Sequence, residues 1–189
     1  MDIALREAEL AAAGGDVPVG AVAALGDEII ARGRNMREAL DDPTAHAEIL
    51  VIRESAMKLG RWRLHDLTLY VTIEPCAMCA GAIVLARIPR VIFGAMDPKG
   101  GGCGSVFQVV QEPALNHRVE IVSGIKEESC RRVLQEFFEN RRNGQIPPYP
   151  PLLKGGKGGF VHFCDSQKIP AKPSGSSPLL SRRRSLPCD

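Results

Sequence analysis

The sequence lacks long apolar runs. None of the 189 residues lies in a stretch approaching the ~20 consecutive apolar residues that a helix needs to cross a bilayer. The N-terminus also lacks the basic region followed by an apolar segment that marks a secretory signal. We therefore expect a cytoplasmic protein that has no membrane as a partner.

An excess of positive charge is also missing from most of the chain. The formal net charge of +2 is unevenly placed, since residues 147–189 hold seven Lys/Arg and two Asp/Glu, which leaves 17 and 20 in residues 1–146. The mildly basic balance thus comes from the C-terminal part. Bulk charge gives no support for nucleic-acid binding by residues 1–146, where only a local basic patch would serve.

The composition changes at Ile146 and divides the chain in two. The proline-rich run Pro147–Pro151 cannot continue a helix, and Gly155–Gly159 contains nothing that forms a core. The preceding residues have the length and the apolar content of one folded domain. We expect residues 1–146 to form this domain and residues 147–189 to be a disordered appendage.

The sequence does contain one histidine and two cysteines at a spacing that suits metal ligands. Cys76 and Cys79 stand at i and i+3, so on a helix their sulfurs share one face. With His46 they supply three ligands of a tetrahedral zinc ion and leave the fourth position open, as in catalytic sites. Six cysteines would permit disulfides, but a close pair with a histidine partner in a reducing compartment favours a metal.

Glu48 extends this pattern. It stands two residues after His46, where a carboxylate can lie near a metal without binding it. This spacing, followed by Pro75-Cys76 and Cys79, is the signature of zinc-dependent nucleobase deaminases, in which the glutamate moves protons. Two other interpretations are open. One is a buried, helix-capping histidine with two core cysteines; the other is a redox pair, which would make no use of the histidine and the glutamate.

Local patterns predict alternating helices and strands. After an initial hairpin, this alternation indicates an α/β layered sheet with parallel members. The histidine and cysteine segments both fall at helix N-termini, where the helix dipole favours thiolate over thiol. We predict helices over residues 2–13, 43–59, 76–86 and 126–142, and strands over residues 17–25, 28–35, 67–73, 91–94 and 119–122.

The same patterns predict two loops and two apolar helix faces. Residues 36–41 should form a loop. Residues 95–116 should form a long glycine-rich loop, either functional or disordered, that has room for a helical turn at 106–111. The apolar faces of the second and last helices are Ile49, Ile52, Ala56 and Leu59, and Val133, Leu134, Phe137 and Phe138.

Longer segments around these motifs resemble the bacterial tRNA adenosine deaminases, a branch of the cytidine deaminase-like superfamily. The metal motif alone indicates only the superfamily. Asp42-Pro43-Thr44-Ala45-His46 and Asn116-His117-Arg118 narrow the resemblance to the tRNA-editing branch. It covers about residues 1–143 and includes Val17–Val22, Tyr70–Ala82 and Val91–Ala95.

The resemblance implies a fold, a reaction and a set of site residues. The fold would be α/β and cytidine deaminase-like, with a five-stranded mixed sheet between two layers of helices. The protein would be a homodimer with one Zn²⁺ per chain, and it would hydrolyse adenosine to inosine at the wobble position of a tRNA anticodon stem-loop. The implied residues are His46, Cys76 and Cys79 as zinc ligands, Glu48 as proton shuttle, Asn35 as a hydrogen-bond partner of the purine, and Asp97 as an RNA contact.

Two alternatives use the same fold. One is a deaminase of free nucleobases or nucleosides, of the guanine or cytosine type. The other is a non-catalytic partner subunit with structural zinc, which the presence of Glu48 disfavours.

Some residues also have an alternative role. The side chain of Asn35 could instead hydrogen-bond to its own backbone. Candidate phosphate or stacking contacts are Arg61, Trp62, Arg63, Lys99, Arg141 and Arg142. The basic residues are equally suited to be ordinary surface charges, and Trp62 to be partly buried packing.

Overall fold

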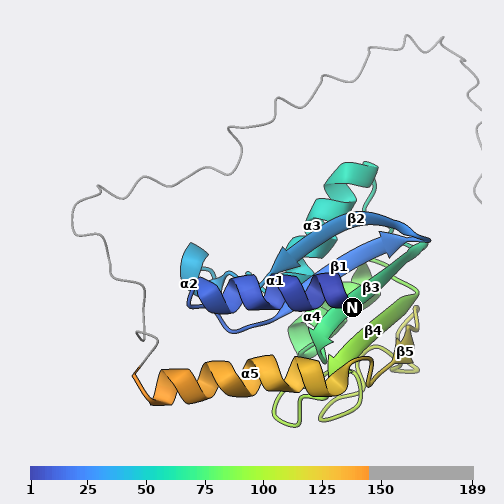
Figure 1. The fold of residues 1–189 in the computed structure, drawn as a ribbon. Coiled ribbons are helices and arrows are strands. Elements are labelled where there is room, and N and C mark those ends of the chain that lie inside the picture. Colours follow the sequence, from blue (N-terminus) through green and yellow to red (C-terminus); the bar gives the residue numbers. More distant parts are fainter. Residues whose placement is uncertain (145–189) are drawn as a thin grey trace, which may run out of the picture. The chain divides into compact units, whose positions relative to one another are not determined.

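A five-stranded sheet organises the part of the chain that the computed structural model describes, residues 1–144. The strands are β1 (Gly20–Leu25), β2 (Glu28–Arg34), β3 (Leu67–Ile73), β4 (Arg90–Ala95) and β5 (Glu120–Val122). They are ordered β2-β1-β3-β4-β5 (Figure 1). β1 pairs antiparallel with β2 and with β3, whereas β3–β4 and β4–β5 are parallel. The predicted mixed sheet of five strands is confirmed.

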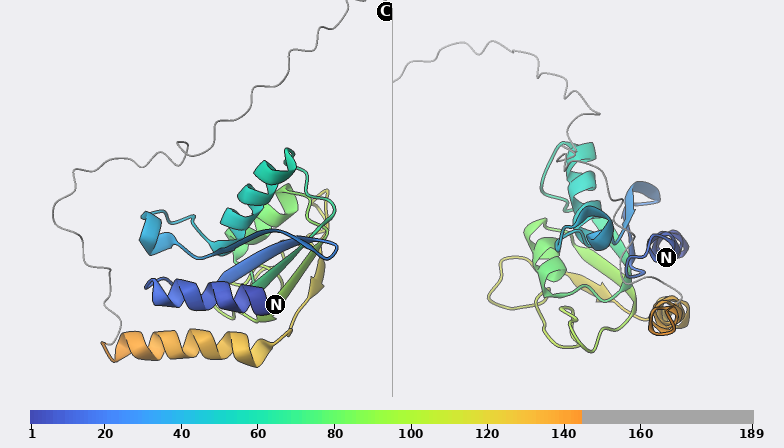
Figure 2. Two further views of the ribbon diagram at one scale, coloured as in Figure 1. Left: turned by 45° about the horizontal axis from the view of Figure 1, so that its top comes forward. Right: turned by 90° about the vertical axis from the view of Figure 1, so that its left-hand side faces the viewer.

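Helices cover both faces of this sheet. The helices are α1 (Asp2–Ala13), α2 (Arg37–Leu40), α3 (Ala47–Leu59), α4 (Ala77–Leu85) and α5 (Glu127–Arg142). α1 and α5 lie against one face, and α3 and α4 lie against the other (Figure 2). The chain therefore has the three-layer α/β/α arrangement that was predicted. None of the helices in the described region is long and apolar enough to cross a membrane.

The predicted domain boundary after residue 146 and the disordered appendage at residues 147–189 lie outside the described residues. Both stay predictions.

The main apolar cluster holds α3 and α4 on the sheet. On β3, Leu67, Leu69 and Val71 are fully buried at alternate positions, and they share one cluster with Val51 of α3 and Ile83 of α4. Each such side chain contributes about 1.5–3 kcal/mol when it is fully buried. The helices are therefore fixed as rigid elements, and any group at their N-terminal ends has a defined position.

The start of the second predicted helix and the loop before it differ most from the predictions, whereas the bounds of the next two helices differ by one residue at one or both ends. The helix predicted over residues 43–59 begins at Ala47, because Asp42 instead shapes a turn in which its carboxylate accepts hydrogen bonds from the backbone N–H (2.8 Å) and the hydroxyl (2.7 Å) of Thr44. The predicted loop at residues 36–41 contains the short helix α2. The N-terminal helix over residues 2–13 and the third strand over residues 67–73 have the predicted bounds.

The long loop after β4 and the predicted apolar faces also differ in detail. Residues 106–111 form no helical turn, and the loop is instead held by contacts to distant residues described below. In α3 the most buried residues are Ala47, Glu48, Val51 and Ser55, while Ile52, Ala56 and Leu59 pack at the margin of the core. In α5 the buried residues are Cys130 and Phe137, whereas Phe138 is 42% exposed, so its assignment to the core was wrong.

Candidate active site

Two helices on the same face of the sheet begin side by side near the end of β3. His46 is the N-cap residue of α3 and Cys76 is the N-cap residue of α4, and both have extended backbones. A backbone hydrogen bond of 3.0 Å from Met36 to Ala45 holds the end of the β1–β2 hairpin against the histidine segment. The adjacent starts of α3 and α4 bring together two segments that lie 30 residues apart in sequence.

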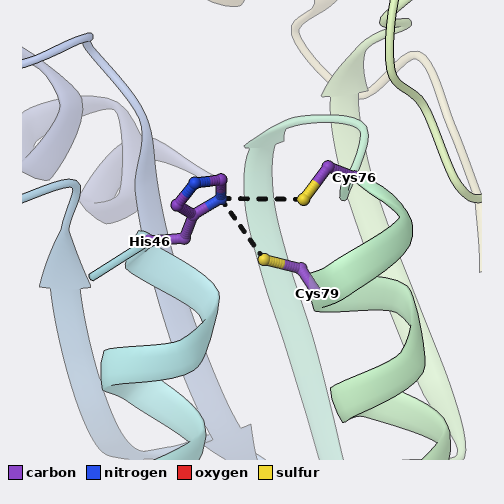
Figure 3. Close-up of side chains that lie close together, drawn as sticks. All are labelled: His46, Cys76 and Cys79. Atoms are coloured by element: carbon purple, nitrogen blue, oxygen red, sulfur yellow. Dashed lines mark hydrogen bonds between the residues drawn. The ribbon is translucent and has the colours of Figure 1, made fainter. Parts of the chain in front are cut away.

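The side chains of His46, Cys76 and Cys79 converge on one point (Figure 3). Nδ1 of His46 lies 3.7 Å from Sγ of Cys76 and 3.5 Å from Sγ of Cys79, and the three atoms lie within 4.8 Å of one another. Tetrahedral zinc with Zn–N of about 2.0 Å and Zn–S of about 2.3 Å requires N–S separations of about 3.5 Å. The group fits such a centre, and among residues 1–144 no other group of this kind is found.

The two thiols of this group ionise differently. The hydrogen bond from Cys79 outweighs burial and lowers the pKa of Cys76 to about 4, and His46 adds to the effect. The pKa of Cys79 is raised by its position beside Cys76 and by burial, while the hydrogen bond to Cys76 raises the pKa of His46. The group holds one thiolate readily. A second thiolate requires added positive charge, which a divalent metal ion supplies.

Glu48 lies in the first turn of α3, beside this centre. Its side chain is buried, with only 3% of the residue exposed, and it lies within hydrogen-bonding reach of Cys79. Burial raises the pKa of its carboxyl, because the charged form is poorly solvated there. A carboxyl with an elevated pKa beside a metal centre has the properties of a general acid–base catalyst.

Glu74 is a site residue that the sequence prediction missed. It is 1% exposed and accepts backbone hydrogen bonds from Asp97 (3.0 Å), Cys103 (2.9 Å) and Ser105 (3.0 Å), together with one from the Ser105 hydroxyl. Burial alone would raise the pKa of Glu74, but these hydrogen bonds lower it. The available signal was an acidic residue directly after a buried strand and before Pro75.

The loop held by Glu74 packs against the start of α4. Gly101 forms an isolated antiparallel bridge with Cys76, and the N–H of Gly102 donates to the carbonyl of Pro75 at 2.7 Å. A Cβ at Gly101 would overlap the Glu74 carboxylate. The glycine-rich sequence thus permits the loop backbone to approach the metal-binding segment closely.

Asn35 directly follows β2 and lies beside the histidine segment. It is 5% exposed, and its neighbour Met36 is bonded to Ala45, which precedes His46. The side-chain amide donates to Oδ1 of Asp16 at 3.2 Å. The Asn35 side chain therefore bonds to a carboxylate that is distant in sequence, and it does not bond to its own backbone.

Asp97 lies in the loop held by Glu74 and is half-buried. Its carboxylate accepts a hydrogen bond of 3.0 Å from the backbone of Lys99, and its carbonyl accepts one of 3.0 Å from Gly101. Both bonds shape the loop itself. A contact of Asp97 with RNA stays a prediction.

Of the candidate RNA contacts, Lys99 lies in the same loop as Asp97, whereas the others lie away from the centre. Arg61, Trp62 and Arg63 follow the C-terminal end of α3, about 20 Å from its start for a helix of 13 residues. Arg61 pairs with Asp66 at 2.5 Å, and the Arg63 guanidinium lies 4.3 Å from the Trp62 ring centre. These contacts suit a folded surface, so roles in RNA binding stay predictions. Two further candidates, Arg141 and Arg142, end α5 on the opposite face of the sheet.

Asn116-His117-Arg118, one of the two segments that narrowed the resemblance to tRNA editing, has a structural use. Asn116 accepts a hydrogen bond of 2.5 Å from Arg87, and the ring Nε2 of His117 donates to the carbonyl of Ile88 at 2.8 Å. Both bonds tie the end of the long loop to the connection between α4 and β4. The motif therefore fixes the fold at the end of α4 that is remote from Cys76.

The chain is similar in sequence to known proteins. Residues 1–142 match the family model of MafB19-like deaminases. A tRNA-specific adenosine deaminase of Bacillus subtilis is 51% identical over 142 residues, which are 75% of this chain and 88% of the relative. A tRNA-specific adenosine deaminase of Aquifex aeolicus is 49% identical over 146 residues, 77% of this chain and 96% of the relative.

Solved structures agree with the sequence relatives. One comes from a study of A-to-I editing by tRNA:A34 deaminases at the wobble position of transfer RNA; it has a TM-score of 0.69 and 46% identity over 71% of this chain and 97% of that chain. A guanine deaminase from Nitrosomonas europaea, with a TM-score of 0.60 and 21% identity over 72% of this chain and 81% of that one, is alike in fold. This chain therefore belongs to the MafB19-like deaminases and, within them, to the tRNA-specific adenosine deaminases.

Proposed function

We propose that this protein is the enzyme that converts adenosine to inosine by hydrolysis at the wobble position of a tRNA anticodon. The observation that carries the reaction is the convergence of His46, Cys76 and Cys79 beside the buried carboxyl of Glu48. The substrate class follows from relatives about half identical to this chain that are named tRNA-specific adenosine deaminases.

The histidine and the two cysteines are proposed to hold one zinc ion per chain. Their separations fit tetrahedral zinc, and their two sulfurs with a neutral imidazole balance its charge. When bound, zinc lowers the pKa of a water molecule from ~15.7 to about 7 and so supplies the nucleophile near neutral pH.

Glu48 is proposed to carry the protons of the reaction. It accepts one proton from the attacking water and delivers it to a ring nitrogen of the adenine; it then takes the second proton from the hydroxyl newly bonded to C6 and passes it to the departing amine. One water is consumed and one ammonia is released for each inosine formed. Burial of Glu48 supports this role, because a carboxyl with a raised pKa gives up and regains a proton more readily near neutral pH.

Asn35 is proposed to hydrogen-bond the purine, and Asp97 to contact the RNA near the target nucleotide. The burial of Asn35 next to the histidine segment supports the first role. The position of Asp97 in a loop anchored beside Cys76 supports the second. A cytoplasmic location stays a prediction.

We propose a homodimer because apolar side chains are exposed on the outer face of α4. This helix is apolar on all sides, which is typical of a helix covered by protein. Nevertheless Met78 is 38% exposed and Leu85 is 74% exposed in the single chain. A Cβ at Gly81, between them, would meet no atom within 4 Å. A second copy packed on this face would bury the two apolar side chains.

The test is inosine formation in an anticodon stem-loop that carries adenosine at the wobble position, measured by mass spectrometry of the digested RNA with ammonia release in parallel. The matched controls are the same stem-loop with its only adenosine moved to the stem, free adenosine, and free guanine. We expect inosine from the first RNA alone. Ammonia from free guanine or a free nucleoside, with none from the RNA, would contradict the tRNA assignment.

A further inference from the structure

Asp16 is a buried carboxylate with no part in the chemistry described above. It is 2% exposed and stands in the turn between α1 and β1, where its backbone N–H donates to the carbonyl of Ala11 at 3.0 Å. One oxygen accepts hydrogen bonds from the Asn35 amide (3.2 Å) and the Glu38 backbone (3.0 Å), and the other accepts one from the Ala39 backbone (3.2 Å). Asp16, which precedes β1, thus holds in place the residues that follow β2.

The first consequence concerns α2. Its N-cap residue, Met36, has no side chain that can cap the helix. Asp16 supplies this cap from a distance by accepting the N–H groups of the second and third helical residues. The backbone just after Asn35 is therefore held in place by the same carboxylate that binds the Asn35 side chain.

The second consequence concerns the amide of Asn35. An ionised aspartate only accepts hydrogen bonds, so the Asn35 group that faces Asp16 must be the NH₂ end. The amide is thereby prevented from rotating by half a turn. One N–H and the carbonyl oxygen are left for another partner.

No residue of the described chain satisfies that carbonyl oxygen. The one hydrogen bond formed by the Asn35 side chain within residues 1–144 is the bond to Asp16. The only unpaired side-chain polar atom there that is fully enclosed is Oγ of Ser55, so the Asn35 oxygen retains contact with solvent. A residue that is 5% exposed thus keeps an unpaired acceptor open to a ligand.

An acceptor next to a donor matches one edge of adenine. That edge offers the N7 acceptor and the N6 amine donor, and an asparagine reads the pair with its amide N–H and its carbonyl oxygen. We infer that Asp16 is a positioning residue that fixes the orientation of the Asn35 amide, so that the site prefers a purine with N7 and a 6-amino group. This inference rests on the proposed function, since it requires the base to bind beside Asn35.

The test compares two stem-loops, with adenosine or 7-deazaadenosine at the wobble position. The second base keeps the amine but replaces N7 by a C–H group. The wild type should prefer adenosine in kcat/KM by about 5- to 150-fold, the range for one bidentate base contact. In Asp16→Asn this ratio should fall towards one, because an amide at position 16 accommodates either orientation of Asn35. Asp16→Glu, which still only accepts, should keep the ratio even if its kcat/KM is lower.

Three controls separate positioning from a general structural role. Metal content and melting temperature are measured for each variant. Glu7→Gln removes another buried carboxylate, which pairs with Arg32 and Arg34 of β2 at 3.4 Å. It should cost stability and keep the adenosine preference. In the Asn35→Ala background, Asp16→Asn should cause no further loss of kcat/KM.

The outcomes distinguish the inference from the proposed function. A wild type that makes no inosine from the adenosine stem-loop contradicts the proposed function itself. A wild type that edits both RNAs equally contradicts the inference. An Asp16→Asn variant with the wild-type ratio, or with a loss that adds fully to that of Asn35→Ala, contradicts it as well. Should Asp16→Asn fail to fold, a lost preference in Asp16→Glu would overturn the inference and a kept preference would support it.

Discussion

The carboxylate of Glu74 accepts hydrogen bonds from both the backbone N–H and the hydroxyl of Ser105, which lies 31 residues further along the chain. Glu74 itself stands two residues before the candidate ligand Cys76. One buried side chain therefore links the metal-binding segment to the long loop after β4. Backbone N–H groups of that loop would be left without acceptors if Glu74 were absent, so loop order and site geometry depend on each other.

The first prediction is that Glu74→Gln destabilises the fold by about 1–3 kcal/mol at neutral pH, because a charged acceptor of several hydrogen bonds is lost. Since the pKa of Glu74 is lowered in the folded protein, its contribution is present above the ordinary value of 4.5 and is lost as the pH falls below it. Urea denaturation of wild type and variant should therefore differ most at pH 7 and converge in acid.

Glu120→Gln is the matched control for this prediction. Glu120 is exposed and pairs with Arg90 at 2.8 Å, and surface pairs of this kind contribute ~0–1 kcal/mol. Hydrogen exchange should show residues 96–108 opening in Glu74→Gln and not in Glu120→Gln. Equal stability of the two variants at pH 7 would show that Glu74 does not hold the loop.

The candidate metal-binding group was predictable from sequence because it rests on local spacing. Cys76 and Cys79 lie one helical turn apart, and Glu48 is fixed relative to His46 by two residues. The start of the histidine helix was less predictable, because an aspartate before a proline is typical both of an N-cap and of the turn that Asp42 forms.

Asp16 and Glu74 were not predictable in the same way. Their partners lie 19 to 31 residues away in sequence, and a single carboxylate that accepts distant N–H groups leaves no periodic pattern. The face of α5 was only partly predictable. Cys130 and Phe137, two turns apart, face the sheet, whereas Phe138 is rotated by one residue towards solvent.

The second prediction concerns the metal. Cys79→Ser should lose bound zinc together with activity, because the site then keeps only two of its ligands. Chelation should lower the melting temperature of the wild type and leave that of Cys79→Ser unchanged, since a metal stabilises only the fold that binds it. Metal content is measured by mass spectrometry. Cys130→Ser, at a buried cysteine on α5, should keep the metal. Equal zinc in wild type and Cys79→Ser would contradict the assignment.

The third prediction separates metal binding from proton transfer. Glu48→Gln should keep zinc and reduce inosine formation by about 10²–10⁴-fold, the usual contribution of a general acid–base group. Single-turnover kinetics on the wobble-adenosine stem-loop measure the chemical step. Glu54→Gln changes a partly exposed glutamate of the same helix, which pairs with Lys58 at 2.6 Å, and should leave the rate nearly unchanged. Near-normal turnover in Glu48→Gln would remove Glu48 from the mechanism.

The fourth prediction tests the proposed homodimer on α4. Leu85→Glu should convert the protein to a monomer, measured by light scattering across a range of concentrations, because a charge would be buried between the two copies. Leu10→Glu, at a residue of α1 that is 52% exposed, is the matched control and should stay dimeric.

Gly81→Ala gives a more specific version of the same test. Alanine favours a helix interior over glycine by about 1 kcal/mol, and a Cβ at position 81 meets no atom of this chain within 4 Å. If the chain acted alone, the substitution should only stabilise it. If a second copy packs closely against α4, the monomer should gain stability while the dimer dissociates more readily. A wild type that is monomeric at every concentration, or a Gly81→Ala variant that dimerises as strongly as the wild type, would exclude close packing at this face.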